Sequence, residues 1–132
     1  MLQTDPISDF LTRIRNAQKA RHASVDVPLS KTKERLAAIM KREGFISNYR
    51  SVPGKPQNVL RVTLRYNPSG EPMIAKIMRI SKPGCRVYAT AKELGAQQNA
   101  VRTTIVTTSK GMMTDREARE SKLGGELICS LI

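Results

Sequence analysis

The chain has 132 residues and a formal net charge of +12, from 23 Lys and Arg against 11 Asp and Glu. Hydrophobic residues make up 39% of it and recur along nearly its whole length, which excludes intrinsic disorder and allows one domain or two small ones. So basic a chain favours a polyanionic partner, and nucleic acid is the commonest one. There is no Trp, and the three tyrosines suffice for only one or two stacking contacts with bases: Tyr49, Tyr66 and Tyr88.

The location and redox state also follow from composition. No basic region precedes an apolar run at the N-terminus, so a signal peptide is not expected, and no apolar run is long enough to cross a membrane. Cys85 and Cys129 each lie in an apolar, strand-like context, so we expect two small buried side chains rather than a disulfide. We therefore expect a cytoplasmic protein that contacts no membrane.

Two helices are predicted in the N-terminal part. The first begins after Asp5, a good N-cap, and carries apolar residues at helical spacing as far as Ala17. A short strand over residues 25–27 follows. The second helix has Ser30 as its N-cap and Gly44 as its terminator.

The next segment predicts a β-hairpin. Strands over residues 45–52 and 59–66 flank a turn rich in Pro and Gly, and the second strand alternates apolar residues with basic or hydroxyl residues. Residues 1–66 are therefore expected to form an α-β-α-β-β domain. Residues 67–72, with two prolines and a glycine, are expected to be the linker.

Residues 73–132 are expected to form a C-terminal domain that is mostly β, with one short capped helix. Thr114 and Glu117 have the spacing of a capping box, and the helix is expected to end at Gly124-Gly125. The expected strands cover residues 73–80, 85–88, 103–108 and 126–132, with one helical turn over 91–98. The fold class is thus α+β, with two small α/β domains.

A hydroxyl-rich segment between the strand at 103–108 and the capped helix is the main candidate site. Its hydroxyls, ammonium group and free amide groups suit phosphate oxygens and the ribose 2′-OH, which both donates and accepts hydrogen bonds. Glu126 opens the last strand and is expected nearby, where it could accept from a base amino group or position the ammonium. An ordinary strand-to-helix turn explains the same residues equally well. The segment consists of Thr107, Thr108, Ser109, Lys110 and Gly111.

The remaining polar residues do not predict catalysis. Asp115 and Glu117 belong to the first turn of a helix, where carboxylates complement the dipole, rather than to a metal-dependent nuclease. The only histidine, His22, lies far in sequence from both cysteines and offers no zinc site or catalytic triad. We expect no enzyme, no metal and no cofactor.

Several of these segments together resemble a known family over essentially the whole chain. The similar segments are the one from Thr107 to Arg116, then Gly124-Gly125-Glu126 and Cys129, with Asp5-Pro6-Ile7, Leu11 to Asn16, Glu43 to Ile46 and Ser81 to Gly84. The chain resembles the bacterial form of small-subunit ribosomal protein eight, the S-eight family. One departure is Thr107, where the family's loop usually begins with Ser. Thr keeps the hydroxyl but restricts χ1, so we expect binding with altered local geometry.

The resemblance implies a structural constituent of the small ribosomal subunit that binds a helix of the central domain of its RNA during early assembly. It implies a main contact through the hydroxyl segment and Glu126, and further contacts in both domains. The implied further RNA-binding residues are Lys82, Arg86 and Tyr88 in the C-terminal domain, and Arg13, Arg15, Asn16, Lys31 and Lys55 in the N-terminal domain.

The implied partners are that RNA and neighbouring small-subunit proteins, with a monomer outside the ribosome. Some members repress translation of their own operon by binding a similar messenger structure. The sequence leaves open whether this chain does so, and whether its source is bacterial or organellar.

The expected mechanism is RNA binding without turnover, in which Lys and Arg displace counterions while the hydroxyl segment reads RNA shape. Residues such as Lys55 and Arg61 are expected to contribute electrostatics alone. Two rivals remain: a binding module for duplex DNA, which hydroxyl side chains would serve equally well, and a small basic nuclease that would depend on Asp115.

Overall fold

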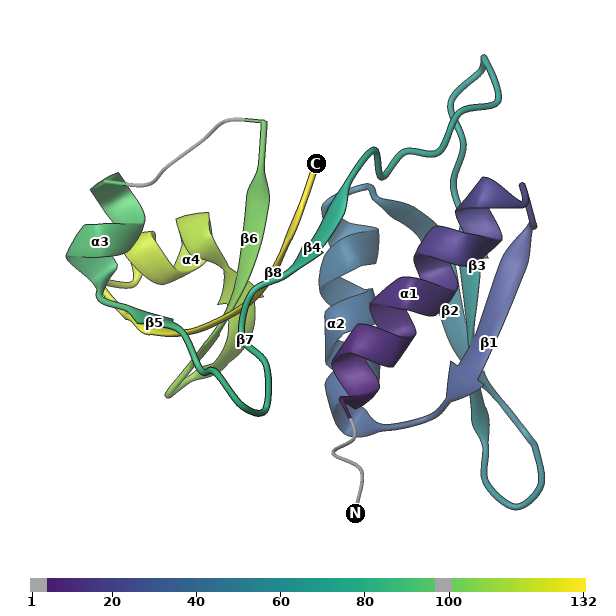
Figure 1. Ribbon diagram of the computed structural model, residues 1–132, viewed down its shortest axis with the longest axis horizontal. Helices are drawn as coiled ribbons and strands as arrows, with labels where there is room; N and C mark the ends of the chain where they lie inside the picture. Colours follow the sequence, from purple (N-terminus) through teal and green to yellow (C-terminus); the bar gives the residue numbers. More distant parts are fainter. Residues whose placement is uncertain (1–4, 97–100) are drawn as a thin grey trace. The chain divides into compact units, whose positions relative to one another are not determined.

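The computed structural model describes residues 5–96 and 101–132. It divides into two units, one formed by Pro6–Ala75 and the other by Asp5 together with Lys76–Ile132. The predicted class, α+β with helices and antiparallel sheets in two small units, is confirmed (Figure 1). The expected linker at 67–72 belongs to the first unit, because Tyr66 pairs with Pro72 and the amide of Asn67 donates to Glu71.

The first unit has the predicted α-β-α-β-β order. Its elements are α1 (Pro6–Lys19), β1 (Ser24–Pro28), α2 (Lys31–Arg42), β2 (Ile46–Val52) and β3 (Val59–Leu64). The strands form an antiparallel sheet in the order β1-β3-β2, so the predicted hairpin of β2 and β3 is confirmed and both β1 and β2 are edges.

The apolar periodicity of the first unit matches its burial. Leu60, Val62 and Leu64 of β3 are buried while Thr63 between them is exposed, as the alternation in the sequence predicted. The helices contribute a larger buried set, Phe10, Leu11 and Ile14 from α1 with Leu36, Ala37 and Met40 from α2. Amphipathic helices on one face of a polar-backed sheet explain this unit's core.

Three helices end in the same hydrogen-bonded motif. At the end of α2, Gly44 has φ of +84°, its amide donates to Lys41, and the amide of Phe45 donates to Met40. This is a Schellman cap, as predicted for Gly44. The same cap ends α1 and α4, but there a charged residue holds the left-handed position, Arg21 at φ 60° and Lys122 at φ 59°.

The second unit contains β4 (Ile77–Arg79), β5 (Tyr88–Ala89), α3 (Ala91–Ala96), β6 (Thr103–Thr108), β7 (Gly111–Thr114), α4 (Asp115–Glu120) and β8 (Gly125–Leu131). Its sheet has the order β4-β8-β6-β7, with β5 also paired to β8. Helices α3 and α4 pack on it around an apolar cluster that includes Leu94, Val106, Ala118 and Leu127 (Figure 1). Every strand pair in this sheet is antiparallel.

The second unit differs from the expectation in four ways. Residues 111–114 form strand β7 instead of leading directly into a helix, because Gly111, at φ +112°, reverses the chain into a hairpin. The strand expected at 85–88 shrinks to β5, since Lys82 and Cys85 pair across a tight turn. The strand expected at 73–80 shrinks to β4. The turn expected at 91–98 is a second helix, α3, and the expected end at Gln98 lies outside the described residues.

Cys85 corrects a further expectation. It is exposed in the turn before β5, whereas Cys129 is fully buried in β8, and both are free. Predicting burial for Cys85 from its neighbours failed because the strand does not extend to that residue.

Candidate nucleic-acid interface

A row of four residues crosses the sheet of the second unit at one end. Strand register places Glu126 of β8 opposite Tyr88 of β5 on one side and Thr107 of β6 on the other, and Thr107 opposite Met112 of β7. Residues paired in this way lie on the same face of a sheet. Three sequence neighbours of row residues belong to the apolar cluster under the helices, namely Ala89, Val106 and Leu127. Because side chains alternate along a strand, the row itself lies on the opposite face of the sheet.

The row presents a mixed chemical surface. Tyr88 is 66% exposed, one of the most exposed large apolar side chains in the described chain, and Thr107 is exposed as well. An aromatic ring, a carboxylate and a hydroxyl thus lie in neighbouring positions on strands that are spaced about 4.8 Å apart. Stacking, hydrogen-bond acceptance and hydroxyl contacts are available within one small area.

The hydroxyl segment is the tip of the β6–β7 hairpin. Thr108 pairs with Gly111, so Ser109 and Lys110 form the turn, and both are exposed. Thr108 differs from its neighbours because it is only 8% exposed. Its Oγ1 donates to the carbonyl of Gly111 at 2.9 Å and accepts from the amide of Lys110 at 3.1 Å. The tip therefore offers the side chains of Thr107, Ser109 and Lys110 to solvent, while Thr108 serves the turn itself.

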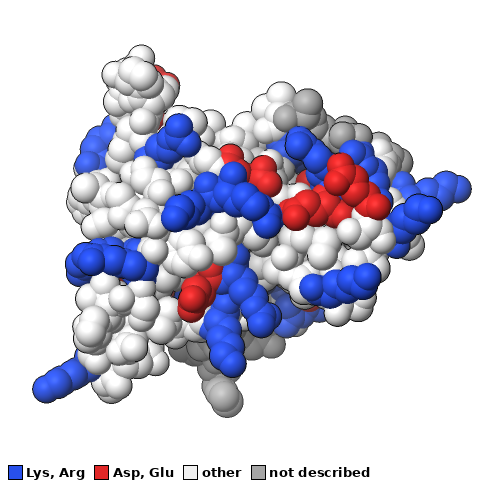
Figure 2. Space-filling model, turned by 180° about the vertical axis from the view of Figure 1, so that it is seen from behind, with Lys and Arg blue, Asp and Glu red and all other residues white. Residues whose placement is uncertain are grey.

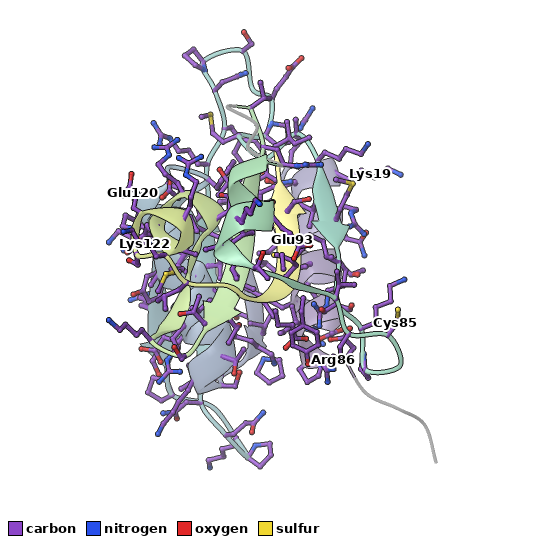
Figure 3. The ribbon with its side chains drawn as sticks, turned by 90° about the vertical axis from the view of Figure 1, so that its left-hand side faces the viewer. Lys19, Cys85, Arg86, Glu93, Glu120 and Lys122 are labelled. Atoms are coloured by element: carbon purple, nitrogen blue, oxygen red, sulfur yellow. The ribbon has the colours of Figure 1, made fainter. Side chains whose placement is uncertain are left out.

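Glu126 lies beside the hydroxyl segment, as predicted, and its carboxylate is held by Arg86. Arg86 Nη1 donates to Glu126 Oε2 at 3.0 Å, with 20% of the Glu126 side chain exposed and 48% of the Arg86 side chain. The alternative in which Glu126 positions Lys110 has no such contact among the described residues. In Figure 3 Arg86 lies beside the strands and Cys85 lies at the outside of the turn.

The turn before β5 is fastened at one side chain. Ser81 is fully buried, and its Oγ donates to the carbonyl of Val87 while accepting from the amide of the same residue at 2.8 Å. Lys82 follows it and is exposed at the mouth of the turn, paired with Cys85. Ser81 thus fixes the segment that carries Lys82 and Arg86 toward Glu126.

Two glycines allow the strands to close around Glu126. A Cβ at Gly125 would overlap the carbonyl oxygen of Thr107, and one at Gly124 would overlap that of Ala89. Sequence reasoning assigned these glycines to the end of a helix, which instead finishes at Glu120 with Ser121 as its cap. The missed signal is that glycine at the start of a strand marks close approach of another backbone.

The candidate residues of the first unit lie on exposed positions of separate elements. Arg13, Arg15 and Asn16 are exposed on α1, and Arg13 Nε also pairs with Asp9 at 2.9 Å, one helical turn earlier. Lys31 begins α2, and Lys55 lies in the loop that joins β2 and β3. Lysine and arginine are spread over the face shown in Figure 2, with acidic side chains in smaller groups.

Sequence reasoning missed two basic residues with structural roles. Lys33 is 6% exposed, and its Nζ donates to the carbonyl of Pro28 at 2.9 Å, while its burial lowers the pKa of its ammonium group. Arg61 donates twice to Asp26, at 2.8 and 3.0 Å. These hydrogen bonds lower the pKa of Asp26, and the charges of Arg61 and Arg50 act in the same direction. Arg61 is thus already neutralised by a neighbour.

The acidic residues near α4 have structural partners. Thr114 and Glu117 form the predicted capping box, with Thr114 Oγ1 accepting from the amide of Glu117 and Glu117 Oε1 accepting from that of Thr114. Asp115 Oδ1 accepts from the amide of Thr104 at 3.4 Å. Across residues 5–96 and 101–132, no three His, Cys, Asp or Glu side chains gather as metal ligands would, and no helix is long and apolar enough to cross a bilayer.

Comparison with known proteins places the chain in a family. The family model described as ribosomal protein S8 matches residues 5–132. Small ribosomal subunit protein uS8 from Halalkalibacterium halodurans is 51% identical over 128 residues, which is 97% of each chain. The protein of the same name from Streptococcus pneumoniae, strain Hungary19A-6, is 48% identical over the same share of both chains.

The chain therefore belongs to the ribosomal protein S8 family. The predicted class, a ribosomal protein of the small subunit that is not an enzyme, is confirmed by this membership. The Asp115-dependent nuclease is thereby set aside.

Proposed function

We propose that this protein binds small-subunit ribosomal RNA through the hairpin tip and three residues of the adjoining row, Tyr88, Glu126 and Thr107. The observation that carries the proposal is their juxtaposition. An exposed hydroxyl and an exposed ammonium, Ser109 and Lys110, lie at the end of strands whose side chains supply a ring, a carboxylate and a second hydroxyl. These groups suit bases and 2′-hydroxyls that are not shielded within a regular duplex.

The target we propose is an irregular helix in the central domain of that RNA, contacted during early assembly. A regular A-form major groove is too narrow to admit side chains, so a reader with this chemistry needs bulged or unpaired nucleotides. The reading group is the tip and the row, with Lys82 and Arg86 beside them. The cations of the first unit supply affinity by releasing counterions, through Arg13, Arg15, Lys31 and Lys55, and the neutral amide of Asn16 adds a hydrogen-bonding contact.

We also propose that the protein meets neighbouring small-subunit proteins once assembled, and that the same tip and row repress its own operon by binding a messenger of similar shape. Support for the messenger comes from the family resemblance of residues 107–116 and 124–126. Both RNAs would contact the same side chains, so ribosomal RNA and the messenger would compete for this surface.

The test separates specific recognition by the hairpin tip from non-specific electrostatic affinity. Ser109→Ala is expected to weaken binding of the small-subunit RNA transcript by about 1–3 kcal/mol, with little change in salt dependence, because a single hydroxyl contact is lost. Lys55→Gln is expected to weaken all RNAs alike and to lower the slope of log Kd against log salt by about one unit or less. Filter binding at several salt concentrations measures both.

Controls decide between the remaining possibilities. Arg61→Gln is a poor electrostatic probe, because Asp26 already neutralises that guanidinium. Equal losses on the ribosomal transcript and on random RNA for Ser109→Ala would contradict a reading role for the tip. Equal affinity for a duplex DNA of matched sequence would contradict the 2′-hydroxyl argument and favour the DNA-binding rival.

A further inference from the structure

A hollow of about 440 Å³ lies in the first unit, between α2 and the edge strand β2. Its lining residues are Lys31, Glu34, Arg35 and Ala38 of α2 with Tyr49 of β2. The volume lies within the range of roughly 300–1,000 Å³ that is usual for small-molecule sites. None of the groups that line it, apart from Lys31, belongs to the RNA-binding set proposed above.

Helical spacing produces the charged wall of the hollow. Lys31, Arg35 and Ala38 recur at intervals of four and three residues, which places them on one face of α2. Ala38 carries only a methyl group and is half-buried, so it leaves room at this end of the wall. Glu34 provides one acceptor between the two cations.

Tyr49 forms the opposite wall. It pairs with Val62, a fully buried residue of β3, so its side chain lies on the helix-covered face of the sheet, at the open edge that β2 forms. Its exposure is intermediate. Lys41 Nζ lies 5.9 Å from the ring centroid, so the ring already participates in a cation–π contact.

We propose that this hollow is a second RNA contact, which holds one unpaired nucleotide with its base against Tyr49 and its phosphate against Lys31 and Arg35. Charge complementarity selects the occupant. Two cations and one carboxylate line the hollow, Lys31, Arg35 and Glu34, and Lys41 adds a third cation at the Tyr49 ring. This combination of a cationic groove with a stacking platform matches single-stranded nucleic acid. Glu34 can accept from a base amino group. The inference rests on the proposed RNA-binding function, and to the electrostatic contacts of the first unit it adds a site that stacks one base.

The decisive experiment uses ultraviolet crosslinking of the full chain to small-subunit RNA transcript, followed by tryptic digestion and mass spectrometry. A nucleotide is expected on Tyr49 in the peptide of residues 43–50, and Tyr49→Leu is expected to abolish it. In filter binding, Tyr49→Leu is expected to weaken affinity about fivefold or more, as loss of one stacked base does. Arg35→Gln is expected to weaken it severalfold and to lower the salt slope.

Two further variants keep the result interpretable. Ala38→Leu fills the hollow without removing charge or the ring, and is expected to weaken binding as Tyr49→Leu does. Arg42→Gln removes a charge from the same helix outside the lining residues and is expected to retain near-normal affinity. Circular dichroism of each variant establishes that it folds. If Tyr49→Leu does not fold, the affinity of Ala38→Leu tests the proposal in its place.

The outcomes distinguish this site from the hairpin tip. Normal affinity for Ala38→Leu and Tyr49→Leu, alongside a loss for Ser109→Ala, would overturn the second contact and leave the proposed function standing. If Ser109→Ala, Tyr49→Leu and Ala38→Leu all kept normal specific binding, both the second contact and the proposed function would be overturned. A Tyr49 crosslink that forms only with an added ribosomal protein, and to that protein, would also overturn the proposal, because the hollow would then be a protein interface.

Discussion

The carbonyl oxygen of Thr107 occupies the place that a side chain would take at Gly125. Thr107 lies on β6, and Gly125 lies on the adjacent strand β8, directly before Glu126, which pairs with Thr107. A methyl group at Gly125 would meet backbone atoms, which cannot rotate away as a flexible side chain would. The absence of a Cβ at Gly125, as at Gly124, therefore allows the strands of the candidate interface to approach this closely.

Gly125→Ala is expected to lower the free energy of unfolding by about 1–3 kcal/mol, because the strands must separate locally to admit the methyl group. Thermal and urea unfolding of the full chain measure the change. Gly84→Ala is the matched control: a Cβ there meets no atom within 4 Å and no positive φ is required, so its stability should stay near wild type. Equal melting of the two variants would show that the strands yield without cost.

Lys122→Gly is expected to stabilise the protein by roughly 0.5–1 kcal/mol. Lys122 holds the left-handed position just beyond α4 (Figure 3), where a non-glycine residue costs about 1–2 kcal/mol against about 0.5–1 kcal/mol for the entropy of glycine. The reverse exchange tests the same cause, since Gly44→Ala at the equivalent position of α2 should destabilise by a similar amount. Denaturant unfolding of both variants checks the opposite signs.

Asp26 should titrate below 3.8, its ordinary value, because Arg61 donates two hydrogen bonds to its carboxylate and holds its pKa down. A depressed carboxyl pKa contributes stability above about pH 4, and this contribution disappears as the pH falls through the folded value. The pair is half exposed, so the contribution is small and salt-sensitive.

Carbon-13 NMR of the Asp26 carboxyl group in Arg61→Gln should show its pKa returning toward 3.8. Arg65→Gln is the control, because Arg65 donates instead to the carbonyl of Gly44 and should leave the Asp26 titration curve unchanged. A curve that is identical in wild type and in Arg61→Gln would refute the assignment.

The two cysteines should differ sharply toward iodoacetamide at pH 8. Cys85 is exposed and should be alkylated in the native protein, whereas Cys129 is fully buried and burial raises the pKa of its thiol to about 12. Cys129 therefore stays a protonated thiol at this pH and is also shielded from the reagent. Intact mass should show one adduct in buffer, none in Cys85→Ser, and two for the wild type only in denaturant.

Local patterns predicted the first unit almost completely. The structure confirms Ser30 as the N-cap of α2 and Gly44 as its terminator. It also confirms the buried face of β3 that the alternation of Leu60, Val62 and Leu64 predicts. These signals are short-range, because caps and alternation depend on residues within a few positions. Because these signals agree with one another, the element order predicted for this unit matches the structure.

The second unit was harder because its strands depend on partners distant in sequence. The pattern Met112-Met113 does not distinguish a strand from the start of a helix, and the decisive feature is the reversal at Gly111. Similarly, no neighbour of Arg86 shows that it reaches Glu126, forty residues away. The sequence shows which side-chain groups the candidate site contains, whereas it does not show that β5 and β6 both pair with β8.

The hydroxyl of Thr108 has a consequence for association. By bonding to Lys110 and Gly111, it holds the hairpin turn in one arrangement before any partner arrives. The conformational entropy of this segment is lost when the chain folds, so docking need not pay for it again. In the RNA contact proposed above, a tip that is held in this way gains affinity through preorganisation, without adding a single intermolecular bond.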